Sequence, residues 1–466
     1  AGGRRAVHAR GGRPDGGRGM RDPSMGGRAV HRASRFHRFL GVAAGVLAGG
    51  AAVGAPTGSV IFVHPDGTSS ATWAAVRALH RGPDGDLEWD LLPAVAVYRG
   101  HMADSLTATS NGGATTHAYG VKVASDAYGR TAGGERGRAI LDADGGSASV
   151  AAQALRAGLP VGLVQTGDAP EPGTGCFVVS SEDRGRYEEI AAGLLASGAT
   201  VLFSGGERYF LPVGAEGVHG PGARRDGRDL IAEAREAGYT VIRTREELLA
   251  LPEETEKVLG LFAERATYND RTEEELAARG LPLFDPEAPT VAEMTEAALR
   301  VLERRGERFL LVVEEEGTDN FGNNNNAAGV LEAARRADEA IGVARRFLER
   351  RPQTLLLTAA DSDAGGMRMV GIPASAKIPE RLPERESNGA PIDGVGGTGT
   401  APFLAAPDRS GVRLPFYVAW ASRGDVSGGV LVRAEGLNSD RVRGSMDNTE
   451  IAELMRLTLF GGEGGR

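Results

Sequence analysis

The sequence predicts an α/β fold in which a mostly parallel central sheet is covered by helices on both faces. Short apolar runs rich in β-branched residues alternate with amphipathic stretches at helical spacing along most of the chain. These runs are apolar throughout and do not alternate with polar residues, which is typical of strands buried on both faces. Strands separated by helices pair in parallel, because each helix returns the chain to the same end of the sheet.

Length and charge restrict the classes of function. At 466 residues the chain can form one large α/β domain or two smaller ones. Residues 1–55 carry ten Arg and two Asp, a net charge of +8, so the rest of the chain carries −17 of the total of −9. This acidic body argues against nucleic acid as a specific partner. The single cysteine, Cys176, excludes a disulfide within the chain.

Residues 1–56 are expected to be a disordered extension followed by a segment that resembles a signal peptide. Residues 1–34 are rich in Gly and Arg and show no periodicity. A basic stretch, a short apolar run at 39–48 and small residues at 53–55 then follow in the order of a secretory signal. The apolar run is too short and too rich in Gly to span a membrane. We therefore expect export to the periplasm or the extracellular space, with a flexible Ala/Gly tail as the alternative.

The expected elements begin with a strand at 59–64, a turn at 65–70 and a helix near 73–79. Further strands are expected at 159–165, 201–203, 240–242, 309–313, 354–357 and 416–420. Further helices are expected at 187–197, 230–237, 290–304, 327–350 and 448–459, and Asp229 is expected to cap the second of these. Residues 364–414 are rich in Gly, Pro and Ser, and we interpret them as a surface insertion within one domain at 57–466.

Acidic residues follow three of the expected strands directly. Asp66 follows the first strand, Glu314, Glu316 and Asp319 follow the strand at 309–313, and Asp361 follows the strand at 354–357. The carboxyl ends of parallel strands meet at one edge of the sheet, where such sheets bind ligands. Carboxylates gathered there repel one another, so bound cations are implied, and oxygen donors suit Mg²⁺, Mn²⁺ or Ca²⁺. Each cluster taken singly is also compatible with a helix N-cap or a solvated turn.

A stretch of hydroxyl and small residues at 102–122 places Ser110 directly before Asn111-Gly112-Gly113 at a loop-to-helix junction. Unpaired N–H groups at a helix start and the helix dipole favour an anion there, such as a phosphoryl group or an alkoxide. An ordinary Ser/Thr-rich helix start is the alternative interpretation. Ser105, in the pair Asp104-Ser105, is the competing serine.

Several motifs between residues 59 and 460 together resemble the alkaline phosphatase family. They are Ala114-Thr115 with Gly120-Val121-Lys122, and the segments 204–210, 226–229, 244–248, 259–262 and 446–451. The resemblance implies that residues 57–466 form a metal-dependent phosphomonoester hydrolase that acts through a phosphoserine intermediate. Its partners would be small-molecule phosphate esters, and a homodimer is compatible with the resemblance.

The resemblance also implies roles for individual residues. Counting back from Gly120 places the family's nucleophile, which also contacts the metal, on Ser110. Asp66 would bridge two metal ions, and Asp361 would be a further metal ligand. Arg184 is the candidate phosphate clamp, because a guanidinium group can bind two oxygens at once, with Arg186 as the alternative.

Other metal ligands are implied around Asp319. Asp319 and Asn323 take the family's Asp and His positions four residues apart. Glu314 has the family's spacing to Asp319, whereas Glu316 matches the local Glu-Gly pair, so both are candidates for the third-metal ligand.

The chain departs from the family at the zinc ligands, because its last histidine is His219 and the family's three zinc histidines lie in its second half. Asn323 and Ser362 replace two of them, and Gly397 of Gly397-Thr398-Gly399 is the nearest match to the third. We therefore expect Mg²⁺, with Mn²⁺ or Ca²⁺ as alternatives, in preference to Zn²⁺. His64 flanks the site, and we expect a structural role for it, with a ligand role as the alternative.

Two other functions remain open from the sequence. One is a phosphate-binding relative with little turnover. The other is a phosphodiesterase or another hydrolase of the same superfamily. A sulfatase is disfavoured, because the residues around Cys176 do not form the Cys-x-Pro-x-Arg motif of that class.

Overall fold

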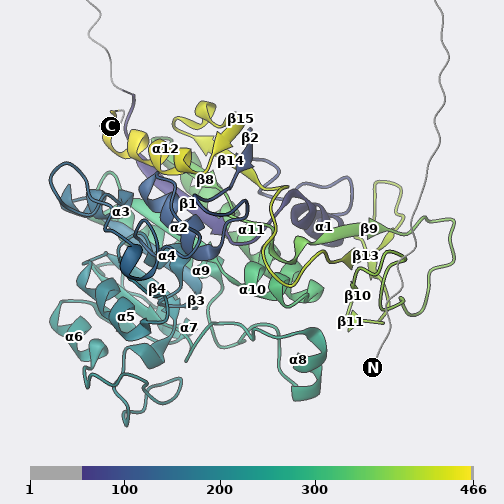
Figure 1. Cartoon of the computed structure of the whole chain (residues 1–466), viewed down its shortest axis with the longest axis horizontal. Coiled ribbons are helices and arrows are strands. Elements are labelled where there is room, and N and C mark those ends of the chain that lie inside the picture. The colour runs from purple at the N-terminus through teal and green to yellow at the C-terminus, as the bar shows by residue number, and fades with distance from the viewer. Residues whose placement is uncertain (1–54, 463–466) are drawn as a thin grey trace, which may run out of the picture. The chain divides into compact units, whose positions relative to one another are not determined.

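The central element is a ten-stranded sheet with the order β15-β2-β14-β8-β1-β7-β3-β4-β6-β5 (Figure 1). Its strands are β15 (Arg443–Asp447), β2 (Ala94–Arg99), β14 (Leu431–Gly436), β8 (Thr354–Thr358), β1 (Ser59–Pro65), β7 (Leu310–Glu315), β3 (Val161–Asp168), β4 (Val201–Gly205), β6 (Val258–Leu261) and β5 (Thr240–Ile242). Only β14 is antiparallel to its neighbours β2 and β8 within this sheet of residues 55–462. The predicted mostly parallel sheet is therefore confirmed.

This computed structural model describes residues 55–462. The disordered extension and the signal-peptide-like segment expected within 1–56 lie outside these residues, apart from Ala55 and Pro56. Among the helices between residues 55 and 462, none combines the length and the apolar character needed to cross a membrane.

The strands at the middle of the sheet are buried along their whole length, as their continuous apolar runs predict. Every residue of β1, β7 and β8 is buried. Successive side chains of β1 point to opposite faces, so Phe62 enters one core and Val63 the other. Each such side chain contributes about 1.5–3 kcal/mol when it is fully buried. This double burial holds the carboxyl ends of the strands in fixed register.

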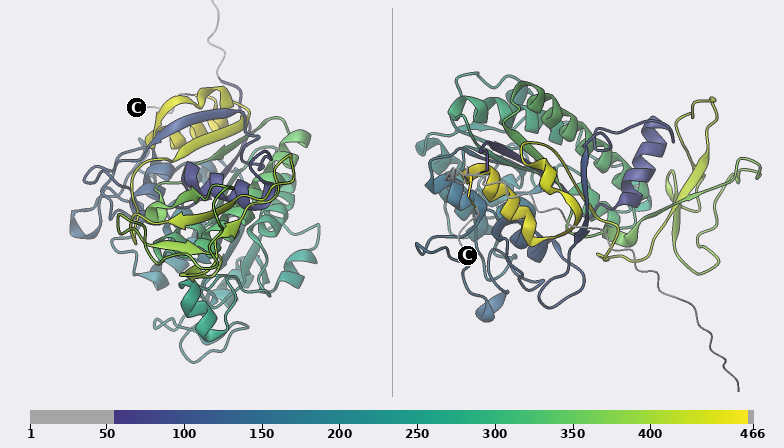
Figure 2. Two further views of the ribbon diagram at one scale, coloured as in Figure 1. Left: turned by 90° about the vertical axis from the view of Figure 1, so that its right-hand side faces the viewer. Right: turned by 90° about the horizontal axis from the view of Figure 1, so that it is seen from above.

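Helices cover both faces of the sheet (Figure 2). One face packs against α1 (Ser70–Arg81), α7 (Arg245–Leu249), α9 (Val291–Arg305) and α11 (Ala327–Arg350). The other packs against α2 (Ser110–Tyr119), α3 (Val150–Arg156), α4 (Pro172–Gly175), α5 (Tyr187–Ala196), α6 (Leu230–Glu236) and α12 (Thr449–Phe460). The shorter helices α8 (Glu273–Arg279) and α10 (Gly317–Asn323) lie in connections.

Helix starts follow the capping residues in the sequence. The carboxylate of Asp229 accepts hydrogen bonds from the N–H groups of Ile231 and Ala232 at 3.0 and 2.9 Å, so the predicted N-cap of α6 is confirmed. Thr290 and Glu293 form a reciprocal capping box at the start of α9.

The insertion expected at 364–414 contains strands that the sequence pattern does not predict. These are β9 (Arg368–Gly371), β10 (Ile392–Gly394), β11 (Gly397–Thr398) and β12 (Phe403–Leu404), which join β13 (Pro415–Ala419) in a second, antiparallel sheet. Strands of two to four residues are too short to show a periodicity. The small sheet lies beside α1 (Figure 1), and the chain leaves β13 toward the main sheet through residues 420–430.

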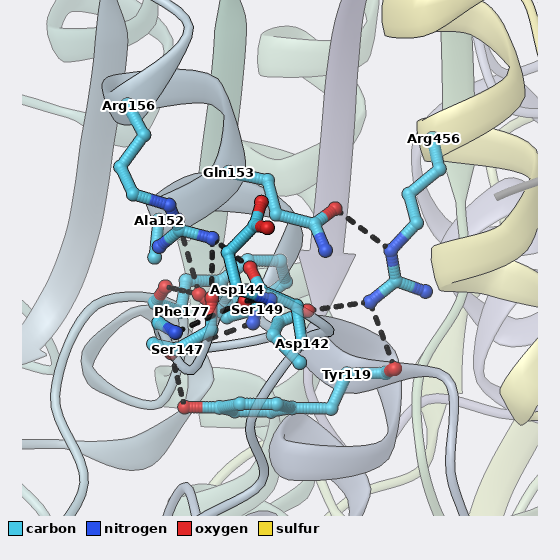
Figure 3. A network of polar contacts seen from close by, with 12 residues as sticks. Tyr119, Asp142, Asp144, Ser147, Ser149, Ala152, Gln153, Arg156, Phe177 and Arg456 are labelled. Atoms are coloured by element: carbon cyan, nitrogen blue, oxygen red, sulfur yellow. Dashed lines mark hydrogen bonds and ion pairs between the residues drawn. The ribbon is translucent and has the colours of Figure 1, made fainter. Parts of the chain in front are cut away.

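Helix α2 is fixed at its carboxyl end by Arg456 of α12 (Figure 3). The guanidinium group of Arg456 donates to the carbonyl oxygens of Tyr119 and Ala148 at 2.8 and 2.7 Å, and to the side chain of Gln153 at 3.1 Å. Burial lowers the pKa of this arginine. The contacts join α2, α3 and α12, so they set the position of the helix that begins at Ser110.

We predict that Arg456→Met lowers the free energy of unfolding by about 2 kcal/mol, because two carbonyl oxygens lose their charged donor. Urea unfolding followed by circular dichroism measures this change. Arg443→Met is the matched control, since Arg443 is exposed on β15 and should change the stability by less than about 0.5 kcal/mol. Equal effects of the two substitutions would contradict an anchoring role for Arg456.

Candidate active site

Ser110 is the first residue of α2. Thr109 caps the helix: its hydroxyl accepts from Gly112 N at 3.5 Å and donates to Ser125 O at 2.5 Å. The side chain of Ser110 is half-buried and makes no hydrogen bond to any residue between 55 and 462. The hydroxyl therefore lies at the positive end of a capped helix, as the sequence predicted for this junction. Ser105 lies outside the helix, in the preceding loop.

The acidic residues that follow three strands converge at one edge of the sheet. Strand β1 lies between β8 and β7, and its register pairs Val63 with Thr358 on one side and His64 with Glu314 on the other. The side chains of Asp66, Glu314 and Asp361 are 0–3% exposed. The predicted cluster is thus present, and it is buried.

Glu314 and Glu316 both lie on the Asp66 side of the sheet, whereas Glu315 points to the opposite face. Glu315 is held there by the hydroxyl of Thr166 at 2.8 Å. Ligand-type atoms of His64, Asp66 and Glu314 lie within 4.8 Å of one another, and so do those of Asp66, Glu316 and Asp319. The structure therefore brings both glutamates to Asp66, where the sequence left a choice between them.

Many oxygens of this cluster are buried without a hydrogen bond. Within residues 55–462, no partner is found for Oδ2 of Asp66, Oε2 of Glu316, or either carboxylate oxygen of Glu314 and Asp361. A buried carboxylate without a partner is strongly unfavourable, so these oxygens need protons or cations. A donor set made almost wholly of oxygens fits divalent ions such as Mg²⁺ or Mn²⁺ better than zinc, which prefers nitrogen and sulfur ligands.

The charge state of the cluster follows from its burial. Burial and the neighbouring acids Asp66 and Glu171 raise the pKa of Glu314 to about 8, although His64 opposes the shift. Burial, together with neighbouring carboxylates, also raises the pKa of Glu316, Asp319 and Asp361 well above the ordinary values. Without cations, these shifts favour the protonated form of each carboxyl group.

The pKa shifts of His64 and Asp66 favour the charged form of each group, unlike those of the other acids. Burial alone would raise the pKa of Asp66, but the adjacent imidazole outweighs this effect and lowers it. Burial likewise disfavours a charged His64, but Asp66 at 3.2 Å outweighs it and raises the pKa of the imidazole to about 10.

Two glycines allow the acids to approach their neighbours. A Cβ on Gly113, one turn after Ser110 in α2, would lie 2.2 Å from Oδ2 of Asp361. A Cβ on Gly67, whose φ is +64°, would lie 2.8 Å from Oδ1 of Asp319. Asp361 therefore packs directly against the first turns of the helix that carries Ser110.

Asp425, which the sequence did not single out, also belongs to the cluster. The amide nitrogen of Asn323 donates to Asp425 at 3.2 Å and to Asp319 at 3.0 Å, while its oxygen accepts from Gly365 N at 3.2 Å. Asn323 thus presents N–H groups to the two acids, rather than the oxygen that a metal ligand requires. Burial and Asp66 raise the pKa of Asp425.

The match of Gly397 to the third zinc-ligand position is wrong. Gly397 lies in β11 of the small sheet, against Glu274, whereas Asp425 is the residue that the fold brings beside Asp319 and Asn323. Asp425 lies midway between β13 and β14 in sequence and follows neither strand directly, so the search for acids directly after strands could not find it. The only sequence signal is an acid before the turn residues Ser427-Gly428-Gly429.

Arg184 joins this cluster, and Arg186 does not. Arg184 donates to Glu171 at 2.5 Å, and the carboxylates of Glu171 and Glu316 outweigh its burial and raise its pKa. A Cβ on Gly167 would lie 3.0 Å from Glu316 and 3.2 Å from Glu171, so these two side chains flank one backbone position. Arg186 instead pairs with exposed glutamates of its own segment.

A cavity of about 240 Å³ lies beside Asp361 of the cluster. Its walls come from residues 98–101 and from four residues of the segment 426–430, and Asp361 is among the lining residues together with Leu106 and Ala108. The hydroxyl of Ser427 donates to Leu106 O at 2.5 Å and lies 2.9 Å from that of Thr107, which joins the wall at 426–430 to the segment that carries Leu106.

A family model described as alkaline phosphatase matches residues 58–388. The membrane-bound alkaline phosphatase of Bombyx mori is 30% identical over 339 residues, which make up 65% of this chain and 59% of that protein. The match to the tissue-nonspecific isozyme of Rattus norvegicus spans 63% of that protein, so the chain covers only part of both relatives. Streptomycin-6-phosphate phosphatase of Streptomyces griseus is 26% identical over 427 residues, 85% of this chain and 89% of the relative.

Solved structures show the same fold. The alkaline phosphatase of Thermus thermophilus superimposes with a TM-score of 0.67 at 23% identity, over 87% of this chain and 92% of that one. The alkaline phosphatase of the Antarctic bacterium TAB5 gives a TM-score of 0.64 at 19% identity, over 87% and 99% of the two chains.

We predict that Glu314 makes the metal-free protein less stable as the pH rises. Its pKa is raised from 4.5 to about 8 in the folded state, so its stabilising contribution is complete below about pH 4.5 and is lost as the pH rises through 8. Urea unfolding of chelator-treated wild type and Glu314→Gln from pH 5 to 9 measures the difference.

The free energy of unfolding of the wild type should fall relative to that of the variant over this range. Saturating Mg²⁺ or Mn²⁺ should reverse the trend, because a cation binds the deprotonated carboxylate. A difference that is constant with pH would contradict the raised pKa.

Proposed function

Because the chain belongs to the alkaline phosphatase family, we propose that it is a metal-dependent hydrolase of phosphate monoesters with Ser110 as its nucleophile. One observation carries the proposal: buried carboxylates without partners converge beside the helix that begins at Ser110. A phosphate-binding protein with little turnover has no need of a free hydroxyl at that position.

The chemistry can be assigned to residues of the chain. Bound divalent cations would supply positive charge for the ionised hydroxyl and for the leaving oxygen. Ser110 Oγ would attack phosphorus to form a phosphoserine while the alcohol departs with the bridging oxygen. Water would then cleave the phosphoserine, which releases phosphate and restores the hydroxyl. The start of α2 favours the negative charge on the serine oxygen throughout.

The residues that would hold the cations are those with free oxygens. Asp66 is suited to bridge two ions, because Oδ1 faces His64 while Oδ2 has no partner among residues 55–462. Glu314, Glu316, Asp319 and Asp361 supply further carboxylates, and Asp425 provides one beside Asp319 and Asn323. Asn323 joins this set only if its amide turns so that the oxygen faces inward. This donor set supports Mg²⁺ or Mn²⁺.

Arg184 is the proposed phosphate clamp. Its guanidinium group is oriented by Glu171 at 2.5 Å, which leaves further N–H groups to donate to phosphate oxygens. The substrates would be small phosphate esters whose alcohol part lies in the cavity beside Asp361. Relatives that include a membrane-bound enzyme support a protein exported to the periplasm or the extracellular space.

We predict that Ser110→Ala lowers kcat for an aryl phosphate by at least about 10³-fold, because the variant lacks the hydroxyl that would form the covalent intermediate. Ser105→Ala is the matched control and should change kcat by less than about threefold. Both are assayed after removal of metal and refilling with Mg²⁺, Mn²⁺, Ca²⁺ or Zn²⁺ in turn.

The refilled wild type should recover activity with Mg²⁺ or Mn²⁺. Recovery with Zn²⁺ alone would contradict the oxygen-ligand argument, and no activity with any ion would support the phosphate-binding alternative. Preference for a phosphodiester or a sulfate ester would assign the chain to another branch of the superfamily.

We predict that Arg184→Ala lowers kcat/KM for the same ester by about 10²-fold, which corresponds to about 2.7 kcal/mol. The loss reflects a bidentate contact with the phosphoryl oxygens. Arg186→Ala should leave kcat/KM within about twofold, because Arg186 pairs with Glu182 and Glu189 of its own segment. Steady-state kinetics and competition by inorganic phosphate measure the effect of each substitution. Equal losses of kcat/KM in the two variants would contradict the role of Arg184 as the phosphate clamp.

A further inference from the structure

We propose that His64 is a metal ligand, and that with Asp66 and Glu314 it binds a first-row transition-metal ion of the Mn²⁺ type. The inference rests on the proposed function in that it concerns the metal centre of the same site. It adds a nitrogen ligand from the first strand to a chain that has no histidine after residue 219.

The three side chains are buried and have unused donor atoms. His64, Asp66 and Glu314 are 1%, 0% and 0% exposed. Within residues 55–462, no hydrogen-bond partner is found for Nε2 of His64 or for either oxygen of Glu314. Nε2 lies 3.2 Å from Oδ1 of Asp66. Two ligands at about 2.1 Å from one ion and at right angles to each other lie about 3 Å apart, so this spacing fits a shared cation.

The tautomer of His64 is fixed by the chain. Nδ1 lies 2.7 Å from the carbonyl oxygen of Ala359, which can only accept, so the hydrogen is on Nδ1. In the neutral ring, the lone pair is then on Nε2 and faces Asp66 and Glu314. Histidines that bind metals commonly donate their other N–H to a backbone carbonyl in this way. Ala359 follows β8, so the segment that delivers Asp361 also orients the ring.

The environment of Glu314 favours a metal-ligand role for His64 over a simple ion pair between His64 and Asp66. A protonated His64 would satisfy Asp66, but it would leave both oxygens of Glu314 buried and unpaired. Glu314 cannot turn away easily, because it packs against α4, where a Cβ on Gly173 would lie 1.5 Å from Oε1. A cation held by all three residues accounts for the free atoms of His64 and Glu314 together.

The ligand set indicates the type of ion. One imidazole among carboxylates favours Mn²⁺ and later first-row ions over Ca²⁺ and Mg²⁺, which prefer oxygen alone. The neighbouring group of Asp66, Glu316 and Asp319 contains only oxygens. Asp66 can serve both groups with its two oxygens, so the two centres would differ in metal preference while sharing one ligand.

Pulsed electron paramagnetic resonance of the full chain loaded with Mn²⁺ tests the proposal. The expected result is a ¹⁴N coupling from a directly bound imidazole, which changes to the ¹⁵N pattern when the protein is made with ¹⁵N-histidine. His64→Gln should abolish this coupling and weaken Mn²⁺ binding at least about tenfold in equilibrium dialysis. His101→Gln is the matched control, because His101 is exposed near the site and should leave the coupling intact.

The wild-type measurement decides the question even if His64→Gln fails to fold. Absence of a histidine coupling, as expected for an imidazolium paired with Asp66, would overturn the proposal. A coupling that survives in folded His64→Gln would also overturn it. Hydrolysis of an aryl phosphate is measured in parallel: hydrolysis without the coupling rejects only the ligand role of His64. A coupling without hydrolysis supports that role and rejects the proposed function.

Discussion

The mutual repulsion of buried carboxylates at one edge of the sheet is the constraint on which the rest of the structure depends. Asp66, Glu314 and Asp361 end three adjacent strands whose residues are buried on both faces. In a medium of low dielectric constant, their charges cannot coexist unless protons or cations neutralise them. The free energy of apolar burial in the two layers of helices offsets this cost and keeps the strand ends in place.

The surrounding elements place Ser110 next to this acidic edge. Helix α2 is capped by Thr109 at the end where Ser110 lies, and is held by Arg456 at the other. Gly113 lets Asp361 contact the helix backbone, and Gly67 does the same for Asp319 beside β1. The half-buried hydroxyl and the acids are thus positioned by separate elements with their own packing, which is a general condition for a preorganised site.

Two further groups of the cluster, His64 and Asp425, do not directly follow a strand. Asp425 arrives on the segment that returns from the small antiparallel sheet to the main one. His64 lies inside β1, and its ring is directed by a carbonyl of the segment after β8. The second sheet therefore matters to the site through the segment that leaves it, although none of its own strands supplies a carboxylate to the cluster among residues 55–462.

The sequence by itself determined the fold class, most long elements and the convergence of the acids, because these are local properties. Apolar runs, helical spacing and an acid directly after a strand can be read along the chain, and the bounds of α11 follow from it to the residue. Only the tertiary structure decided that Glu314 and Glu316 both face Asp66, and that Asp425 rather than Gly397 lies beside Asp319. It also placed the free nitrogen of His64 toward Glu314. These facts depend on side-chain direction at the end of a strand and on contacts between segments about a hundred residues apart, which no spacing along the chain encodes.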